Sequence, residues 1–246
     1  MPVRQRLIKV SVVVPAHNEG DNIPVLLTQF DQLFSTLPYR TEMIIVDDGS
    51  EDETWREIEK GMDSYPWLRT CQHRSNEGIT SALATAIARS RGEIICFYPA
   101  DLQYHAEELP KLVAAIDSGS DLVTGWRQGD YGLRTFGSVI YNSLSRIMFG
   151  VDVHDLNSIK AFRSEVSVCI SDKPRSHMFM VAIAAHYGFK ITEVKVVLHP
   201  RIHGRSRFYP GRLPGGLFTM CVVKLRMTLG LLKRPEMSKN DVLLNE

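Results

Sequence analysis

Short apolar stretches alternate with amphipathic stretches over the first hundred residues, and this alternation constrains the fold more than any other feature. The apolar stretches are rich in β-branched residues and are typical of buried strands: residues 8–15, 43–46, 67–72 and 93–98. The stretches between them have the spacing of helices that bury one face: residues 23–34, 51–60 and 78–90. The sequence therefore predicts an α/β fold, with a mostly parallel, twisted sheet flanked by helices.

The second half of the chain continues the pattern less regularly. Further helices are predicted for residues 107–116, 133–149, 178–187 and 216–232, and further strands for residues 122–124, 158–162 and 191–198. A polar tail follows, which we expect to be disordered. In the first helix of the chain, Asp21 or Asn22 is placed to cap the amino terminus.

Polar residues follow each of the first four predicted strands. In open α/β sheets, ligands bind beyond the carboxyl ends of the strands. The clusters at these ends are His17-Asn18-Glu19, Asp47-Asp48, Asn76-Glu77-Gly78 and Asp101-Leu102-Gln103. We therefore expect the four clusters to form one binding site.

Two of these clusters carry carboxylates with alternative roles. Asp47-Asp48 either caps the end of a strand, or Asp48 accepts hydrogen bonds from a base or a ribose. Asp101 and Gln103 place two oxygen atoms at i and i+2, a spacing that can converge on one hard cation in a turn. Mg²⁺ or Mn²⁺ is commonly held by one or two carboxylates together with substrate phosphates.

The net charge of +1 hides an asymmetry, because residues 199–234 hold eight Lys and Arg residues and no Asp or Glu. This stretch indicates a phosphate or an anionic membrane surface as partner. Within it, Arg201, Arg205 and Arg207 are close enough to clasp a pyrophosphate or a lipid phosphate. The other candidate phosphate-binding arginines are Arg127, Arg134 and Arg212. His17, His154 and His203 do not have the spacing of metal ligands.

The four cysteines have no CxxC spacing, and we interpret them as reduced core thiols, which fits a cytoplasmic protein: Cys71, Cys96, Cys169 and Cys221. The chain shows neither a secretory leader nor an apolar stretch of the ~18 residues that a spanning helix needs. We therefore do not expect an integral membrane protein.

With these residues in place, the chain resembles the family 2 glycosyltransferases of the GT-A fold, and within them the polyprenyl-phosphate sugar synthases, such as dolichol-phosphate mannose synthase. The resemblance spans about residues 8–210 and rests on the order and spacing of seven motifs. They are VVVPAHNE (12–19), IIVDDGS (44–50), NEG (76–78), PADLQ (99–103), GWR (125–127), DLNSIKAFR (155–163) and RIHGRSR (201–207).

The resemblance implies a role for each matching position. The residues implied to bind the nucleotide-sugar are Pro15, Asn18, Glu19, Asp48 and Gly78. Asp101 and Gln103 would hold Mg²⁺ or Mn²⁺ with the donor diphosphate. Arg127 and Arg134 would meet the acceptor phosphate, and a mobile loop bearing Arg201, Ser206 and Arg207 would close over the phosphates.

Two positions depart from the family pattern. Pro99 stands where the first Asp of the family's Asp-x-Asp metal motif is usual, so one carboxylate remains instead of two. Ile159 replaces the glycine usual in the motif that begins at Asp155. The first change puts the strength of metal binding in question, and the second puts the shape of the acceptor side in question.

The implied reaction is inverting transfer of a hexose from a GDP- or UDP-linked donor to a polyprenyl or dolichyl phosphate. A lipid phosphate is already ionised, so it needs no general base. Two alternatives stay open. One is transfer to a hydroxyl of a glycan, which needs a base, for which Asp155 is the candidate. The other, motivated by Pro99, is a non-catalytic subunit that binds nucleotide-sugars.

The domain organisation that follows is a catalytic domain at residues 1–210, an amphipathic helix at 211–234 and a polar tail at 235–246. The helix either docks on the core or lies on an anionic membrane. The latter would place the protein peripherally on the cytoplasmic face of a membrane, alone or with a membrane-embedded partner subunit. Nucleic acid is not among the expected partners.

Overall fold

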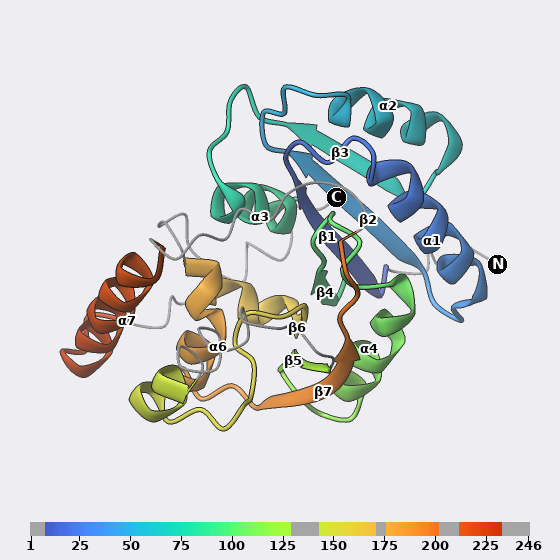
Figure 1. The fold of residues 1–246 in the computed structure, drawn as a ribbon. Coiled ribbons are helices and arrows are strands. Elements are labelled where there is room, and N and C mark those ends of the chain that lie inside the picture. Colours follow the sequence, from blue (N-terminus) through green and yellow to red (C-terminus); the bar gives the residue numbers. More distant parts are fainter. Residues whose placement is uncertain (1–7, 129–142, 171–175, 202–211, 233–246) are drawn as a thin grey trace.

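A seven-stranded sheet forms the centre of the computed structural model, which describes residues 8–128, 143–170, 176–201 and 212–232 (Figure 1). The strand order is β3-β2-β1-β4-β6-β5-β7. The strands are β1 (Val10–Ala16), β2 (Thr41–Asp47), β3 (Leu68–Gln72), β4 (Ile94–Phe97), β5 (Leu122–Gln128), β6 (Lys160–Arg163) and β7 (Ile191–Val197). Strand β6 runs antiparallel to β4 and β5, whereas the other neighbours pair in parallel. The predicted α/β fold with a mostly parallel sheet is confirmed.

Helices cover both faces of this sheet. They are α1 (Ile23–Thr36), α2 (Thr54–Ser64), α3 (Ile79–Ala88), α4 (Leu109–Asp117), α6 (Ser176–His186) and α7 (Arg212–Thr228). The apolar side chains of α1, α2 and α4 belong to one buried cluster, and those of α3, α6 and α7 to the other. In Figure 1, α7 lies outermost, beyond α6. The described elements also include two short 3₁₀ helices, Ala106–Glu108 and Ser164–Cys169, and the helical residues 143–149.

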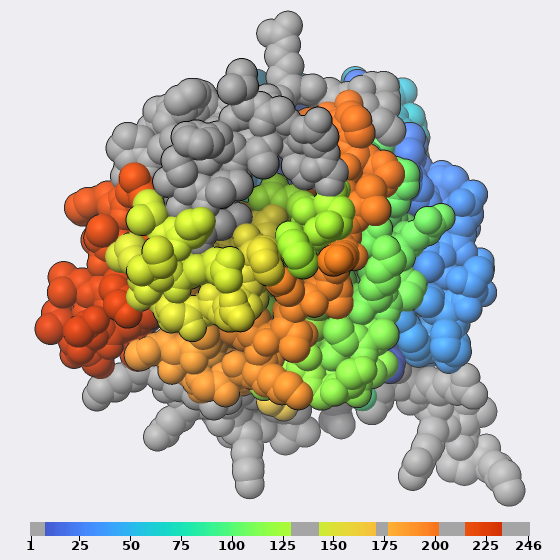
Figure 2. All heavy atoms as spheres, turned by 60° about the horizontal axis from the view of Figure 1, so that its bottom comes forward, coloured from blue at the N-terminus to red at the C-terminus, as the bar shows by residue number. Residues whose placement is uncertain are grey.

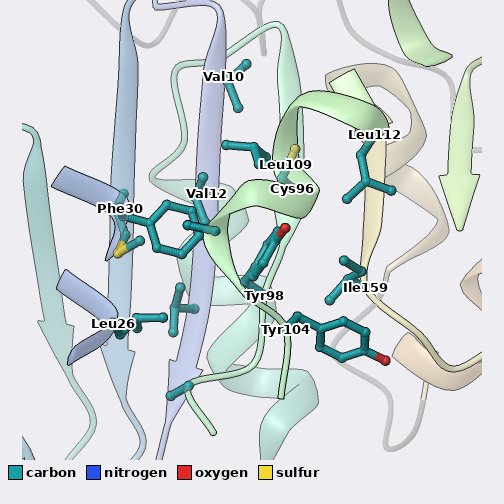
Figure 3. Close-up of a cluster of buried hydrophobic side chains, with 14 of the residues drawn as sticks. Val10, Val12, Leu26, Phe30, Cys96, Tyr98, Tyr104, Leu109, Leu112 and Ile159 are labelled. Atoms are coloured by element: carbon teal, nitrogen blue, oxygen red, sulfur yellow. The ribbon is translucent and has the colours of Figure 1, made fainter. Parts of the chain in front are cut away.

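The core explains why β1 has no polar face. Val12 and Val13 are both fully buried but belong to different clusters, because helices lie on each side of β1. On the α1 side, the rings of Phe30 and Tyr98 meet edge to face at a centroid distance of 5.2 Å, next to Val12 (Figure 3). Burial on both faces thus produces the continuous apolar run that predicted this strand.

The predicted helices and strands that fall in the described residues are present, with ends shifted by a few residues. Of the helix predicted at 133–149, residues 143–149 are described and are helical. The predicted polar tail lies outside the described residues. Asn22, one of the two residues predicted to cap this helix, is the N-cap residue, but its side chain makes no capping bond, because its backbone is already helical. Its side-chain amide instead donates to Glu19 Oε2 at 2.6 Å.

The four cysteines all lie in the described residues and form no disulfide with one another, but the prediction that all four lie in the core is wrong. Cys96 and Cys169 are buried, Cys71 is half-buried, and Cys221 is exposed. Cys221 is exposed because α7 turns only one face, with Met220 and Met227, towards the core.

Candidate functional site

Asp48 lies at the carboxyl end of β2 and ties that end to the start of α3. The residue is 4% exposed. Oδ1 accepts hydrogen bonds from His73 Nδ1 at 2.8 Å and from the Glu77 amide at 3.0 Å, and Oδ2 accepts one from the Gly78 amide at 2.8 Å. Asp48 therefore joins two of the clusters expected from the sequence, and it fixes the backbone of Gly78.

Two histidines complete this junction: His17 belongs to a strand-end cluster predicted to contribute to the site, whereas His73 was not predicted to have a role. His17 Nδ1–H donates to the carbonyl of Asp48 at 2.9 Å, so its Nε2 is the atom that accepts from Asn76 Nδ2 at 2.9 Å. His73 Nε2 lies 3.0 Å from Thr85 Oγ1. The only sequence signal for His17 was its place in a strand-end cluster, and His73 gave none.

Gly49 permits a close approach of two chain segments at the same junction. Its φ of +65° favours glycine, and a Cβ atom there would lie 2.4 Å from the carbonyl carbon of Ser75. Only a residue without a side chain lets the end of β2 pass this close to the loop that precedes α3.

Gly49→Ala is therefore expected to lower the free energy of unfolding by several kcal/mol, on the order of 3. Gly150→Ala is a matched control, since Gly150 has a φ of +66° and no described atom lies within 4 Å of the place that its Cβ would take. It should cost only about 1 kcal/mol. Urea unfolding of both variants measures the difference, and equal losses would show that the contact with Ser75 is unimportant.

The residues after β1 are hydrogen-bonded to the turn before α2 and to the first residue of α2. Asn18 has a φ of +55°, and its side-chain oxygen accepts from the Glu51 amide at 2.9 Å. The Glu19 amide donates to Thr54 Oγ1 at 2.8 Å. Pro15 is half-buried within β1. These contacts bring Asn18 and Glu19 to the edge of the sheet at which Asp48 lies.

Asp101 and Gln103 converge on one cationic group, the guanidinium of Arg201. Asp101 Oδ2 accepts from Arg201 Nη2 at 2.7 Å, and Gln103 Oε1 accepts from Arg201 Nε at 3.3 Å. The residue between them, Leu102, is fully buried with a φ of +57°. This unusual backbone conformation lets the side chains at i and i+2 reach the same positive group, and the hard cation that the spacing predicted at this place stays a prediction.

The charge of Asp101 depends on that contact. The residue is 7% exposed, and burial raises the pKa of its carboxyl above the ordinary value, while the charge of Arg201 opposes the rise. Arg201 thus favours the ionised form of a carboxylate that burial disfavours.

The segment before Arg201 is fastened to the same turn. The His199 amide donates to the Gln103 carbonyl at 2.8 Å, and Gln103 Nε2 donates to the His199 carbonyl at 3.4 Å. The rings of His105 and His199 stack in parallel, with centroids 3.7 Å apart. These partners, nearly a hundred residues apart in the chain, gave no signal in the sequence.

Arg127 and Asp155 form a two-pronged ion pair at the end of β5. Arg127 Nε donates to Asp155 Oδ2, and Nη2 donates to Oδ1 at 3.0 Å. The Asn157 amide also donates to Oδ1 at 3.0 Å. Both carboxylate oxygens of Asp155 are therefore engaged. The other residues expected at the phosphates, Arg134, Ser206 and Arg207, lie outside the described residues.

A buried lysine near this pair was not anticipated. Lys160 on β6 is 4% exposed, and Nζ donates to the Ser158 carbonyl at 2.8 Å. Burial lowers the pKa of Lys160 to about 8, an effect that Asp155 opposes. On α6, His177 Nδ1 lies 2.7 Å from Thr80 Oγ1, and burial, followed by the charge of Lys160, lowers the pKa of His177 to about 4.

His177 gives the fold a predicted pH dependence. Its folded pKa lies below the unfolded value of 6.5, so the unfolded chain binds more protons and stability falls as the pH drops from 6.5 towards 4. Because the residue keeps some exposure, we expect a loss of about 1 kcal/mol between pH 6.5 and pH 5. Urea titrations at both values should show this loss in the wild type and not in His177→Gln. An identical loss in the variant would assign it to other groups.

The outward face of α7 carries apolar side chains between residues 218 and 229. Phe218, Val222 and Leu225 are exposed there, as is Leu229 just beyond the helix, in an i, i+4, i+7, i+11 spacing. The helical residues 143–149 lie beside α7, joined by Ser145 Oγ and Met220 Sδ at 3.7 Å, and Figure 2 shows the two segments side by side on one flank. One face of α7 docks on the core and the other is exposed, so the two interpretations of this helix are compatible.

Neither a preformed metal cluster nor a membrane-spanning helix is present in the described residues. In these parts of the chain, no group of three or more His, Cys, Asp and Glu residues is arranged to hold a metal ion. Within the same residues, no helix combines the length and apolar character needed to cross a membrane.

Comparison with known proteins shows what this arrangement is similar to. The family model described as glycosyl transferase family 2 matches residues 11–166. The undecaprenyl-phosphate 4-deoxy-4-formamido-L-arabinose transferase of Pseudomonas fluorescens (strain Pf0-1) is 31% identical over 231 residues, covering 91% of this chain and 67% of that protein. The dolichol-phosphate mannosyltransferase of Pyrococcus furiosus is 34% identical over 120 residues, covering 49% of this chain and 33% of that protein.

Among solved structures, glucosyl-3-phosphoglycerate synthase from Mycobacterium tuberculosis, in complex with Mn²⁺, UDP and glucosyl-3-phosphoglycerate, aligns with a TM-score of 0.65. The alignment covers 94% of this chain and 82% of that chain, at 20% identity. At this identity the likeness concerns the fold, and it confirms the GT-A fold expected from the sequence.

Proposed function

The chain belongs to glycosyl transferase family 2, and from this membership we propose that it moves a hexose from a GDP- or UDP-linked donor to a polyprenyl or dolichyl phosphate. The relatives that are named for transfer to undecaprenyl phosphate and to dolichol phosphate support a lipid-phosphate acceptor.

The state of the buried carboxylates is the observation that carries the choice of acceptor. Asp48 is held by three N–H donors, Asp101 by Arg201, and Asp155 by Arg127. A hydroxyl acceptor needs a base to remove its proton, whereas a phosphate oxygen is ionised before it attacks. Because these three carboxylates already have partners, the site is better suited to an acceptor that needs no base.

The donor set fits a divalent cation, because Asp101 Oδ2 and Gln103 Oε1 already face one positive group. We propose that these two oxygens hold Mg²⁺ or Mn²⁺, with the donor diphosphate completing the coordination. When bound, such an ion stabilises the charge that develops on the departing nucleoside diphosphate. Support comes from the structural neighbour, which was crystallised in complex with Mn²⁺ and UDP.

The chain's own residues would orient the two substrates. Pro15, Asn18, Glu19, Asp48 and Gly78 lie around the carboxyl ends of β1 and β2 and are proposed to bind the nucleotide-sugar. Asp155 holds the guanidinium of Arg127 in one orientation, in which Arg127 is proposed to meet the acceptor phosphate together with Arg134. Arg201, Ser206 and Arg207 are proposed to contact the donor phosphates.

The exposed face of α7 supports peripheral binding to an anionic membrane. Phe218 is 72% exposed and Leu225 57% exposed, and the same helix carries Lys224 and Arg226 but no acidic residue. Apolar side chains with nearby cations suit insertion into the headgroup region of an anionic bilayer. We propose that this surface binds the cytoplasmic face of a membrane, where the lipid phosphate is presented. The protein would act there alone or with a membrane-embedded partner subunit.

The proposed function is tested by identifying the acceptor to which a labelled hexose is transferred. The purified chain is incubated with labelled GDP- and UDP-hexoses, Mg²⁺ or Mn²⁺, and one of three acceptors: a short polyprenyl phosphate, the matching polyprenol or an oligosaccharide. We expect chloroform-soluble label with the phosphate and not with the alcohol. Label that appears in glycan alone would support the hydroxyl acceptor instead. Donor binding without turnover on any acceptor would support a non-catalytic subunit.

A further inference from the structure

Arg201 is bound to the same two oxygens that are proposed to hold a divalent cation. We propose that Arg201 is an exchangeable cation of the donor site: its guanidinium and the divalent cation compete for Asp101 and Gln103, and the displaced guanidinium then meets the donor diphosphate. This inference rests on the proposed function, because it takes Asp101 and Gln103 as the donor site.

The contacts of Asp101 make the competition unavoidable. Its Oδ2 is 2.7 Å from Arg201 Nη2, and its Oδ1 accepts from the Gln103 amide at 3.2 Å. A cation bound at Oδ2 would therefore meet the positive guanidinium at contact distance, in a place that is 7% exposed and weakly screened by water. One of the two cations has to leave.

Pro99 explains why the two cations exclude each other in this chain. Proline supplies no carboxylate at the position two residues before Asp101. A second carboxylate would allow a metal ion and an arginine to be neutralised side by side. With only one carboxylate, the site neutralises a single cation until the donor adds the negative charge of its diphosphate.

The attachment of the chain before Arg201 allows the side chain to exchange while the backbone stays in place. His199 is held by the hydrogen bond that its backbone N–H donates to the Gln103 carbonyl and by the stacking of its ring on His105. Pro200 follows and restricts the backbone next to this anchor. Rotation about the side-chain bonds of Arg201 would then move the guanidinium away from Asp101 without displacing this anchor.

The test is metal binding without nucleotide, so it does not depend on activity. Mn²⁺ is titrated into the full chain while the electron paramagnetic resonance signal of free Mn²⁺ is followed. If Arg201 leaves Asp101 and Gln103 free in only about one molecule in ten, the apparent affinity for Mn²⁺ is about tenfold weaker than the intrinsic affinity of the free site. We therefore expect Arg201→Gln to bind Mn²⁺ about tenfold more tightly than the wild type and to bind the donor more weakly.

Matched variants separate competition from a general effect of charge. Arg56→Gln removes an exposed arginine of α2 that pairs with Glu53, and its Mn²⁺ affinity should equal that of the wild type. Adding Asp101→Asn to Arg201→Gln should remove the gain. His105→Ala keeps Asp101 and Arg201 but removes the ring that stacks on His199, so Arg201 should be held less firmly at Asp101. This variant should bind Mn²⁺ more tightly than the wild type, by a smaller factor than Arg201→Gln. It serves as the test if Arg201→Gln does not fold.

An unchanged or weaker Mn²⁺ affinity in folded Arg201→Gln, or in His105→Ala if the first variant does not fold, would overturn the exchange. That failure is distinct from failure of the proposed function. Transfer to a lipid phosphate is measured separately, and it can proceed in a chain whose arginine and metal do not compete.

Discussion

Asp101→Asn is expected to lower kcat/KM for sugar transfer by at least about a hundredfold, with the fold unchanged. Asparagine keeps the size of the side chain and its hydrogen bond from the Gln103 amide, but it removes the negative charge that holds Arg201 and is proposed to hold the divalent cation. Loss of a single preorganised electrostatic contact at the reacting groups commonly slows an enzyme by about 10² to 10³. Steady-state kinetics with saturating Mg²⁺ or Mn²⁺ measures the loss.

Asp63→Asn on the exposed side of α2 is the matched control for this variant and should have wild-type activity. Near-normal turnover in Asp101→Asn would remove Asp101 from the donor site. If high metal concentrations fully restored the activity of Asp101→Asn, the carboxylate would contribute only to the affinity for the cation.

Asp48→Asn is expected to lower the free energy of unfolding by about 3 kcal/mol, a loss similar to that of Gly49→Ala. The carboxylate accepts from His73, Glu77 and Gly78, and an amide group in its place would turn an N–H₂ towards at least one of these donors. The junction between β2 and α3 would loosen, so donor binding should weaken as well. Chemical unfolding and isothermal titration with nucleoside diphosphates measure the two effects.

Asp48→Ser adds a useful comparison, because a hydroxyl can accept one of the three bonds without presenting an amide donor. It should recover part of the lost stability but not the donor affinity, if Asp48 also contacts the nucleoside. Full donor affinity in a stable Asp48→Ser protein would leave Asp48 a purely structural residue.

The sheet and its site edge were predictable because their signals are local. Strands β1, β2 and β4 are buried on both faces, which leaves continuous apolar runs such as the one around Val12 and Val13. Parallel strands bring their carboxyl ends to one edge, so Asp48 and Asp101 were expected near each other from chain order alone. The i, i+2 spacing of Asp101 and Gln103 predicted convergence on a hard metal cation; in the structure their oxygens converge on the guanidinium of Arg201, and the metal ion stays a prediction.

The contacts that the sequence did not predict join distant segments. Arg201 was expected to meet phosphates, but its ion pair with Asp101 spans a hundred positions in the chain. The stack of His105 on His199 has the same origin. Such pairings depend on tertiary packing, for which one sequence carries no periodic signal.

The identity of the bond formed tests the central claim most directly. The purified chain, a nucleotide-hexose, a divalent cation and a short polyprenyl phosphate are incubated, and the lipid product is examined by mass spectrometry and ³¹P NMR. We expect a lipid heavier by one hexose residue, whose phosphorus has changed from a monoester to a diester, and no such product with Asp101→Asn. A hexose attached to a hydroxyl, with the phosphate still a monoester, would contradict transfer to the lipid phosphate.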